Sequence, residues 1–244
     1  MYNMIYNTRG IVLRQLKYSE TAAITKIYTE LFGLQSYFIN NVRSRKSKIK
    51  SNMLQPFTLL ELGVYHKEKS GLQRIKYADV LNPAFGITSD VIKGSLAIFL
   101  TDVLGHSIKE QECNQKMFEF LMNAILELEA LRGSCANFHL VFMMQLSRYL
   151  GFYPSSQSSA HDCIFDKREG IFVPVRPEHP DFIVPPLSNY IIHIKNCSFS
   201  ESKNLKLTAS ERSELLHHLI NYYGLHLENF NKIKSHHVLE AVMG

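Results

Sequence analysis

The densest group of chemically active side chains is a basic run at residues 43–50, which reads Arg-Ser-Arg-Lys-Ser-Lys-Ile-Lys. Five of its eight residues are cationic and none is acidic. Such a run repels itself unless counterions or phosphates neutralise it, and every phosphate that it contacts releases condensed counterions. A solvated surface loop is the ordinary alternative for an isolated basic run. The chemistry that the run predicts is non-specific polyanion binding through Arg43, Arg45, Lys46, Lys48 and Lys50.

More cations lie close by in the sequence, together with aromatic residues. Arg74 and Lys76 are two residues apart, so on a strand they share one face. The other cations that we assign to this predicted interface are Arg9, Arg14 and Lys17. Single-strand binders pair a cationic groove with exposed rings, each worth about 1–3 kcal/mol when a base stacks on it. The sequence leaves open which rings are exposed among Tyr18, Tyr28, Tyr37, Phe38, Tyr65 and Tyr77.

The net charge of the chain, +5 over 244 residues, conceals a division. Residues 1–80 hold 13 Lys and Arg against 5 Asp and Glu, a net charge of +8, whereas residues 81–244 hold 14 against 17, a net charge of −3. A basic first third joined to a mildly acidic remainder is expected when one part of a chain meets a polyanion.

Signatures of catalysis and of metal binding are missing. The sequence lacks the phosphate-binding loop, the dinucleotide fingerprint, the nucleophile elbow and the zinc-protease motif. The doublets His217-His218 and His236-His237 show no partner at ligand spacing, and His161 and Cys163 are a weak pair, with His179 further on. We therefore expect that the protein is not an enzyme and that it binds no cofactor and no metal ion.

The cysteines and the N-terminal residues indicate where in the cell the protein is expected. Cys113, Cys135, Cys163 and Cys197 form no C-x-x-C pair and are too few for a disulfide framework. The start of the chain lacks the features of a signal peptide, and no apolar stretch approaches the roughly 20 residues of a membrane span. We expect a cytoplasmic protein with free thiols.

Five segments of the first third have the composition of strands. Residues 5–16, 21–30, 34–41, 56–66 and 72–80 are rich in Ile, Val, Thr, Tyr and Phe, with glycines at expected turns. Five short strands with a longer insertion between the third and fourth predict a small barrel, and the OB-fold is the best candidate. We expect an OB-fold domain over residues 1–80.

Helical patterns dominate residues 81–244. Helices are predicted from about Ser89 to Gly105, around residues 118–128, over 138–150 ahead of a capping Gly151, from the Thr208–Glu211 capping box to Gly224, and over 235–242. Residues 154–206 are rich in proline and glycine and predict an irregular insertion. The predicted fold class is α+β: a five-stranded OB-fold barrel, followed by an α-helical domain with this insertion.

Ordered motifs along nearly the whole chain make it resemble the bacterial RecO family of recombination mediators. They are residues 8–13 (Thr-Arg-Gly-Ile-Val-Leu), 18–21 (Tyr-Ser-Glu-Thr), the basic run, 54–58 (Leu-Gln-Pro-Phe-Thr), 150–154 (Leu-Gly-Phe-Tyr-Pro), 223–227 (Tyr-Gly-Leu-His-Leu) and 234–235 (Lys-Ser). The resemblance implies binding to single- and double-stranded DNA without sequence specificity, and strand annealing. It also implies loading of RecA on DNA coated with single-strand-binding protein, with that protein and RecR as partners, and location at the nucleoid.

Two features of the family bear on the helical domain. Many members carry two C-x-x-C pairs that hold zinc in the insertion, but only Cys163 lies there in this chain, so no zinc is expected. The insertion is instead expected to be held by apolar packing of Ile164, Phe165, Ile171, Phe172, Phe182 and Ile183. The family also docks the acidic, phenylalanine-ended tail of single-strand-binding protein, for which Arg132 and Arg148 are the candidate cations.

Two other functions compete with DNA binding. One is an adaptor that binds proteins and contacts DNA only incidentally, as the mostly acidic helical portion suggests. The weaker one is attachment to an anionic membrane surface, which normally needs an amphipathic or lipid anchor that the sequence does not show. We expect no membrane partner.

Overall fold

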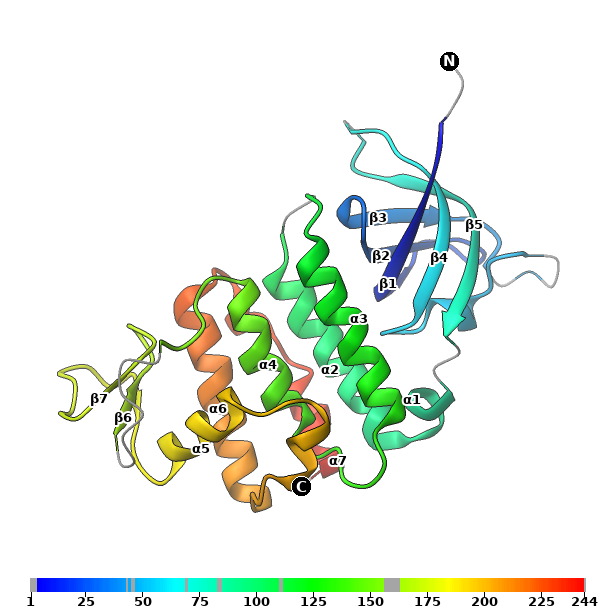
Figure 1. Cartoon of the computed structure of the whole chain (residues 1–244). Coiled ribbons are helices and arrows are strands. Elements are labelled where there is room, and N and C mark those ends of the chain that lie inside the picture. Colours follow the sequence, from blue (N-terminus) through cyan, green and yellow to red (C-terminus); the bar gives the residue numbers. More distant parts are fainter. Residues whose placement is uncertain are drawn as a thin grey trace. The chain divides into compact units, whose positions relative to one another are not determined.

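The structure, a computed structural model, describes residues 4–42, 44, 47–68, 70–82, 85–109, 112–155 and 163–243 (Figure 1). Two compact units divide the chain, and each is described by itself. The first comprises residues 1–90 and 97–129, and the second comprises residues 91–96 and 130–244. The first unit thus groups three helical segments with the N-terminal strands. The domain boundary predicted after residue 80 stays a prediction.

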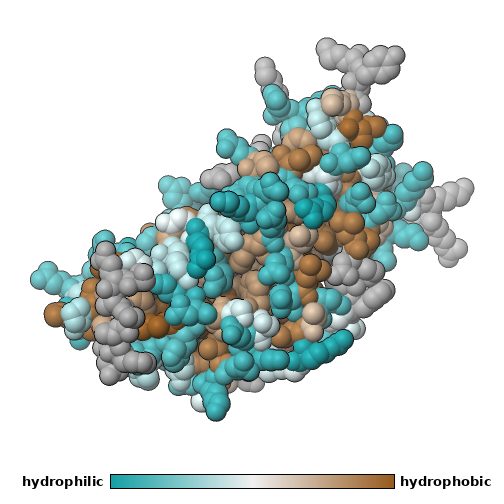
Figure 2. All heavy atoms as spheres, in the orientation of Figure 1, coloured by the Kyte–Doolittle hydropathy of each residue, from teal (hydrophilic) through white to brown (hydrophobic). Residues whose placement is uncertain are grey.

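Hydrophilic side chains are spread between hydrophobic ones over the face drawn in Figure 2. Within the described ranges, no helix has the length and apolar character needed to cross a lipid bilayer.

The first unit is built on a five-stranded, OB-like sheet, which confirms the predicted fold class. Its strands are β1 (Ile5–Lys17), β2 (Ala23–Thr29), β3 (Gly33–Ile39), β4 (Leu59–Tyr65) and β5 (Gln73–Asn82). The pairing order is β1-β2-β3-β5-β4, and it is cyclic because β4 pairs back onto β1. Of the strand pairs that the described residues form in this sheet, the β3–β5 pair is parallel and the others are antiparallel. The five predicted strands are all present, with ends that differ by a few residues.

Alternation in the sequence decides which side chains enter the sheet's interior. Along β3, Gln35, Tyr37 and Ile39 are buried, whereas Leu34, Ser36 and Phe38 are partly exposed on the other face. The interior packs Val12, Ala23, Ile27, Tyr37, Ile39, Val42, Ile49, Leu54, Leu60, Leu62, Val64 and Ala78. Burying each large aliphatic side chain of this set contributes roughly 1.5–3 kcal/mol.

The basic run is anchored to the sheet by the residues at its two ends. Val42 and Ile49 are only 5% and 7% exposed, and both belong to the interior cluster. The backbone N–H of Val42 donates to the Thr21 carbonyl (2.9 Å), and that of Ser51 donates to the Val42 carbonyl (3.2 Å). The 3-10 helix η1 (Ser51–Leu54) follows directly. Both ends of the run are therefore tied to the sheet beside the β1–β2 connection.

Helices α1 (Phe85–Ser89), α2 (Val91–Ser107) and α3 (Gln115–Ala130) follow the sheet. Phe118 of α3 stacks on Tyr28 of β2, with ring centroids 6.3 Å apart. The prediction that α2 ends at Gly105 is wrong, because the helix continues to Ser107. A glycine inside a helix costs about 0.5–1 kcal/mol, and burial of Val103, Leu104 and Ser107 outweighs that cost.

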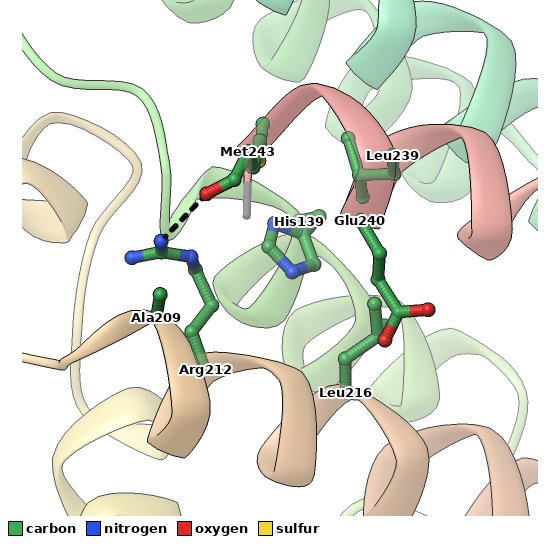
Figure 3. Close-up of a pocket in the computed structure, with 7 residues that line it drawn as sticks. All are labelled: His139, Ala209, Arg212, Leu216, Leu239, Glu240 and Met243. Atoms are coloured by element: carbon green, nitrogen blue, oxygen red, sulfur yellow. Dashed lines mark hydrogen bonds between the residues drawn. The ribbon is translucent and has the colours of Figure 1, made fainter.

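The second unit contains α4 (Phe138–Tyr149), α5 (Leu187–Lys195), α6 (Ala209–His226) and α7 (His236–Met243), with η2 (Ser200–Asn204) and η3 (Phe230–Lys232) between them. After α4, Gly151 has φ +88°, and the Phe152 N–H donates to the Ser147 carbonyl (3.1 Å), which confirms the predicted glycine cap. Helices α4, α6 and α7 surround a small cavity of about 40 Å³ (Figure 3).

The ends of α6 show one correct and one wrong prediction. Thr208 and Glu211 form the predicted capping box, in which the Glu211 N–H donates to Thr208 Oγ1 (3.2 Å) and the Thr208 N–H donates to Glu211 Oε2 (2.8 Å). The helix does not end at Gly224, however, but continues to His226. Gly224 allows Asn231 to approach, since a Cβ there would lie 2.0 Å from Asn231 Oδ1.

The insertion is more regular than its sequence predicts. Strands β6 (Ile164–Asp166), β7 (Ile171–Val173) and β8 (Phe182–Ile183) form a sheet with β6 at its centre, and α5 was not predicted. Phe165 packs on Phe172 (centroids 5.0 Å apart) and on Tyr222 of α6 (5.4 Å). Of the six apolar residues expected to hold the insertion, Phe165, Phe172 and Ile183 are buried, whereas Ile164, Ile171 and Phe182 are half-buried.

Candidate nucleic-acid interface

Cross-strand pairing places apolar and cationic side chains in rows on the outer face of the sheet. We use the term outer face for Arg14, Leu16, Ile24, Lys26, Ser36, Phe38 and Arg74, which are all half-buried or exposed. One row runs from Leu16 to Ile24 and on to Phe38 and Arg74, because these residues pair in register from β1 to β5. The surface formed by β2 and β3 is the one on which OB-folds bind oligonucleotides.

The second row of the outer face brings two cations together. Arg14 lies directly opposite Lys26, and Lys26 lies opposite Ser36. A β-bulge between Val12 and Arg14 shifts the register of β1 at this point, and bulges commonly re-aim side chains beside functional sites. Like charges directly opposite one another destabilise a strand pair. An anion bound between Arg14 and Lys26 would relieve that repulsion.

A hollow beside the outer face gathers three of the predicted DNA-binding cations. Lys48 from the end of the basic run, and Arg74 and Lys76 from β5, line a cavity of about 240 Å³ together with Phe38. A second hollow of about 220 Å³ is lined by Lys17, Gln15 and Ser51, among others. The first hollow shows that tertiary folding places the end of the basic run next to β5, which the sequence spacing does not reveal.

The charges of these cations are not neutralised inside the described part of the unit. Among the described residues, no carboxylate lies within ion-pair distance of Arg14, Lys17, Lys26, Lys48, Lys50, Arg74 or Lys76. Uncompensated cations on one surface raise the local potential and attract phosphates.

Of the six aromatic residues that the sequence left open, Tyr65 and Tyr77 are half-buried, and two others, Tyr18 and Phe38, lie together at the outer face. Tyr18 is 65% exposed, and its ring meets Phe38 edge-on, with centroids 5.4 Å apart. Tyr28 and Tyr37, by contrast, are buried and cannot stack on a base without unfolding. Tyr18 and Phe38 are therefore the rings best placed for base stacking, beside Arg74.

Arg9 differs from the other cations of the predicted interface. Its guanidinium forms two hydrogen bonds with Glu30 (2.6 and 2.9 Å) and lies 5.3 Å from the centre of the Phe118 ring. The hydrogen bond from Arg9 lowers the pKa of the Glu30 carboxyl, and the same bond raises the pKa of Arg9. Arg9 therefore already has a structural partner, and its predicted role in binding DNA is untested.

Some predicted residues lie outside the described ranges. Arg43, Arg45 and Lys46, which form most of the basic run, are among them, as is His161. For these residues the sequence predictions stand alone.

A second group of cations lies in the helical unit. Arg148, at the end of α4, sits 4.4 Å from the centre of the Tyr153 ring, and Lys195 Nζ sits 5.4 Å from the same centre. Burial, and then the charge of Arg148, lower the pKa of Lys195. Arg132 is exposed in the segment between α3 and α4. Arg148, one of the two predicted docking cations, thus lies at the same ring, Tyr153, as a second cation, Lys195.

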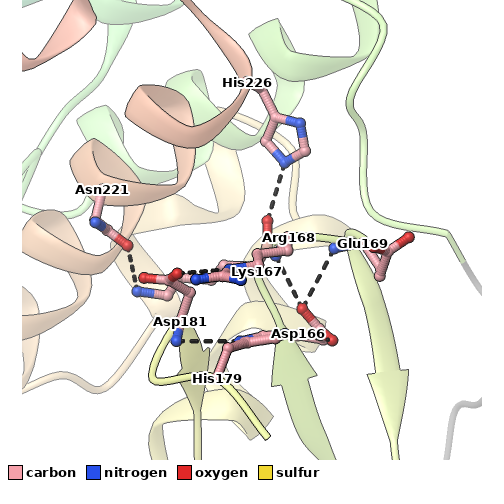
Figure 4. Close-up of polar contacts among 8 residues, drawn as sticks. All are labelled: Asp166, Lys167, Arg168, Glu169, His179, Asp181, Asn221 and His226. Atoms are coloured by element: carbon pink, nitrogen blue, oxygen red, sulfur yellow. Dashed lines mark hydrogen bonds and ion pairs between the residues drawn. The ribbon is translucent and has the colours of Figure 1, made fainter. Parts of the chain in front are cut away.

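The insertion is held by a polar network as well as by apolar packing (Figure 4). Asp166 Oδ1 accepts from the Arg168 and Glu169 N–H groups (2.9 and 3.3 Å), while Oδ2 lies 3.3 Å from His179 Nε2. Arg168 pairs with Asp181 (2.7 Å), and Lys167 donates to Asn221 of α6. The sequence prediction of apolar packing missed this network because its contacts to His179, Asp181 and Asn221 join residues 13 to 54 positions apart.

Sequence reasoning missed Lys26 and Lys195 as members of the two cation groups. Lys26 carries a usable signal, because it is an outward position in the alternating pattern of β2. Lys195 carries no such signal in the sequence, since it comes close to Arg148 only when α5 packs near α4.

The chain thus has an OB-like sheet with a cationic, partly aromatic outer face, followed by a helical unit. OB-folds are a class of domain that commonly binds oligonucleotides. The family model for the recombination protein O N terminal matches residues 4–84, and that for its C terminal matches residues 88–236. The chain therefore belongs to the RecO family.

Curated relatives agree with this membership. DNA repair protein RecO of Flavobacterium psychrophilum is 37% identical over 245 residues, covering 98% of this chain and 99% of the relative. The proteins of the same name from Bacteroides fragilis and Azobacteroides pseudotrichonymphae are 36% and 32% identical with the same coverage. The family supports a role in DNA repair and recombination.

Proposed function

We propose that this protein is a DNA repair and recombination mediator whose OB-like sheet binds the DNA backbone without reading its sequence. The observation that carries the proposal is the hollow that Lys48, Arg74 and Lys76 line together with Phe38. Three cations with no carboxylate partner among the described residues supply counterion release, and a neighbouring ring supplies stacking. None of these groups distinguishes one base from another, so binding is expected to be independent of sequence.

The geometry favours single strands on this surface. In the outer face, the apolar row of Leu16, Ile24 and Phe38 lies beside the cationic row of Arg14 and Lys26. Bases of a single strand are free to stack against the apolar row while their phosphates follow the cations. In a duplex, the bases are already stacked on one another, so only the phosphate contacts remain. Binding to double-stranded DNA is proposed through these phosphate contacts alone.

From family membership we propose the finer activities as well: strand annealing, RecA loading on DNA coated with single-strand-binding protein, and partnership with RecR. We propose a cytoplasmic, nucleoid-associated location on the same ground. Catalysis has no part in this function, since a protein that holds two strands together needs binding surfaces rather than an active site.

The test of the DNA-binding surface is the salt dependence of binding to a single-stranded oligonucleotide. The triple variant K48Q/R74Q/K76Q should lower the slope of log K against log salt by about 2, since each lost phosphate contact removes roughly 0.7. Binding at low salt should weaken accordingly. The measurement is fluorescence anisotropy at several salt concentrations.

A matched control removes the same net charge elsewhere. Lys203, Lys206 and Lys232 are exposed residues of the helical unit, so K203Q/K206Q/K232Q changes the total charge equally. An unchanged slope in the first variant would show that these three cations do not contact phosphates. An equal reduction in both variants would show that total charge rather than this surface governs binding.

One observation favours a second candidate function, docking of a protein partner. Arg148 and Lys195 share the Tyr153 ring, and no carboxylate lies within ion-pair distance of either cation among the described residues. Two cations beside a ring suit the terminal carboxylate of a peptide that ends in phenylalanine. We therefore propose the acidic tail of single-strand-binding protein as a ligand of this group.

A further inference from the structure

Four side chains with metal-ligating atoms gather where the C-terminal helix α7 meets α6. His236 and His237 are the first two residues of α7, and Glu240 follows one turn later. His217 comes from the exposed side of α6. The sequence showed no ligand partner for either histidine doublet, and the fold brings His217 of the first doublet and both members of the second together around a single carboxylate.

The distances within this cluster are short. The ligating atoms of His236, His237 and Glu240 all lie within 4.8 Å of one another. His217 Nε2 is 3.0 Å from Glu240 Oε1, and His237 Nδ1 is 3.9 Å from Glu240 Oε2. The His236 ring lies 4.0 Å from the His237 ring and 5.7 Å from the His217 ring, measured between centroids.

The positions on α7 explain why these groups converge. His236 and Glu240 are four residues apart and His237 and Glu240 are three apart, so both histidines share a helix face with the carboxylate. The i, i+4 spacing also places the two histidines of the zinc-protease motif on one metal. Zinc–ligand bonds of about 2.0–2.2 Å place neighbouring ligand atoms roughly 3.3 Å apart in a tetrahedron. The ligating atoms of His236, His237 and Glu240, all within 4.8 Å of one another, lie near that separation, and His217 Nε2 lies 3.0 Å from the Glu240 carboxylate.

The surroundings of Glu240 also suit a metal ligand. Ser213 Oγ donates to Glu240 Oε1 (2.6 Å), a contact of the kind that orients ligating carboxylates. In Figure 3 the Glu240 carboxylate points away from Arg212, whose guanidinium donates instead to the Met243 carbonyl. His236 is 9% exposed, so its ring is already positioned by packing, whereas His217 and His237 reach solvent. A metal ion therefore has an open side from which to enter.

We propose that His217, His236, His237 and Glu240 bind one divalent transition-metal ion, with Zn²⁺ as the principal candidate. Imidazole nitrogen and carboxylate oxygen are typical zinc ligands, and a set without thiolates or several carboxylates disfavours Cu⁺ and Mg²⁺. The ion ties the C-terminal helix α7 to α6. The match to the family's C-terminal model ends at residue 236, so Glu240 lies beyond it.

The test uses the full chain with Cys113 replaced by serine, because that exposed thiol would otherwise compete for metal. Competition with a chromophoric chelator should show one Zn²⁺ per chain. The substitutions H237A and E240Q should each weaken Zn²⁺ affinity at least about tenfold, and S213A should weaken it through the orientation of Glu240. Zn²⁺ should also raise the melting temperature of the parent chain but not that of E240Q. The control H193A, at an exposed histidine of α5, should leave the affinity unchanged.

Co²⁺ gives a readout that reports geometry. A four-coordinate site produces intense visible absorption, which the parent should show and H237A should lose. The proposal is overturned if the parent binds no Zn²⁺, or if H237A and E240Q, shown to be folded by circular dichroism, bind it as tightly as H193A. In that case the four side chains form only a hydrogen-bonded histidine–carboxylate group.

Discussion

His139 is the residue whose burial has the clearest measurable consequence. It is 1% exposed in α4 and lines the small cavity with Arg212 and Glu240 (Figure 3). Burial first, and then the charge of Arg212, lower the pKa of His139 to about 3. The imidazole is therefore neutral in the folded protein well below the pH at which an exposed histidine gains a proton.

This burial predicts a stability loss in mild acid. In the unfolded chain His139 gains a proton below about pH 6.5, whereas in the folded chain it stays neutral until about pH 3. Between these values the unfolded state binds more protons, so the free energy of unfolding falls as the pH decreases. Urea unfolding at pH 5 and pH 7.5 should show a smaller difference for H139Q than for the parent.

The comparison between the two pH values is the informative quantity, since H139Q also removes packing and lowers stability at both. A control with an exposed histidine, H193A, should keep the parent's pH difference. Equal pH differences in H139Q and the parent would mean that His139 does not remain neutral in the folded state.

At the scale of elements, short-range rules located most strands and helices. The alternation of β3 and the Thr208–Glu211 box are local signals, and both are present in the structure. Because of Gly105 and Gly224, the predicted ends of α2 and α6 came too early in the sequence. A glycine ends a helix only where the backbone leaves the helical conformation there. Helix α5 was missed because Pro185 and Pro186 precede it, although Leu187, Ile191 and Ile194 have helical spacing.

The capping box of α6 predicts a stability effect for one hydroxyl. The Thr208 hydroxyl satisfies the Glu211 N–H, which has no partner within the helix. T208A should therefore lower the free energy of unfolding by about 1 kcal/mol, as measured in urea, whereas T208S keeps the oxygen and should stay close to the parent. A similar loss in both variants would contradict the role of this hydrogen bond.

At the scale of the whole molecule, the division of charge corresponds to two surfaces with different proposed partners. The cations of the outer face belong to the basic first third of the chain, whereas Arg148 and Lys195 lie in the mildly acidic remainder. Because the two groups lie in different compact units, their functions should be separable by substitution.

An experiment on the full chain with two ligands, an oligonucleotide and a peptide, separates the two proposed functions. R148Q/K195Q should weaken binding of an acidic peptide that ends in phenylalanine by at least tenfold, since two charge-assisted contacts are lost, while oligonucleotide affinity is unchanged. K48Q/R74Q/K76Q should show the opposite pattern. Peptide binding is measured by anisotropy of a labelled peptide, and amidation of its terminal carboxylate is the control. Loss of DNA affinity in R148Q/K195Q, with the peptide still bound, would reverse the assignment.

The sequence by itself determined the five strands, most of the helices, the concentration of cations in the first third and the resemblance to RecO. These properties depend on residue type and on spacing within a few positions, which hydrophobic periodicity and charge counting report directly. Only the tertiary structure decided which groups meet. Lys48 joins Arg74 and Lys76, Tyr18 meets Phe38, and His217 meets Glu240 because strand register and helix packing connect residues far apart in the chain. Those long-range contacts follow from the packing of whole elements, so no local pattern in the sequence encodes them.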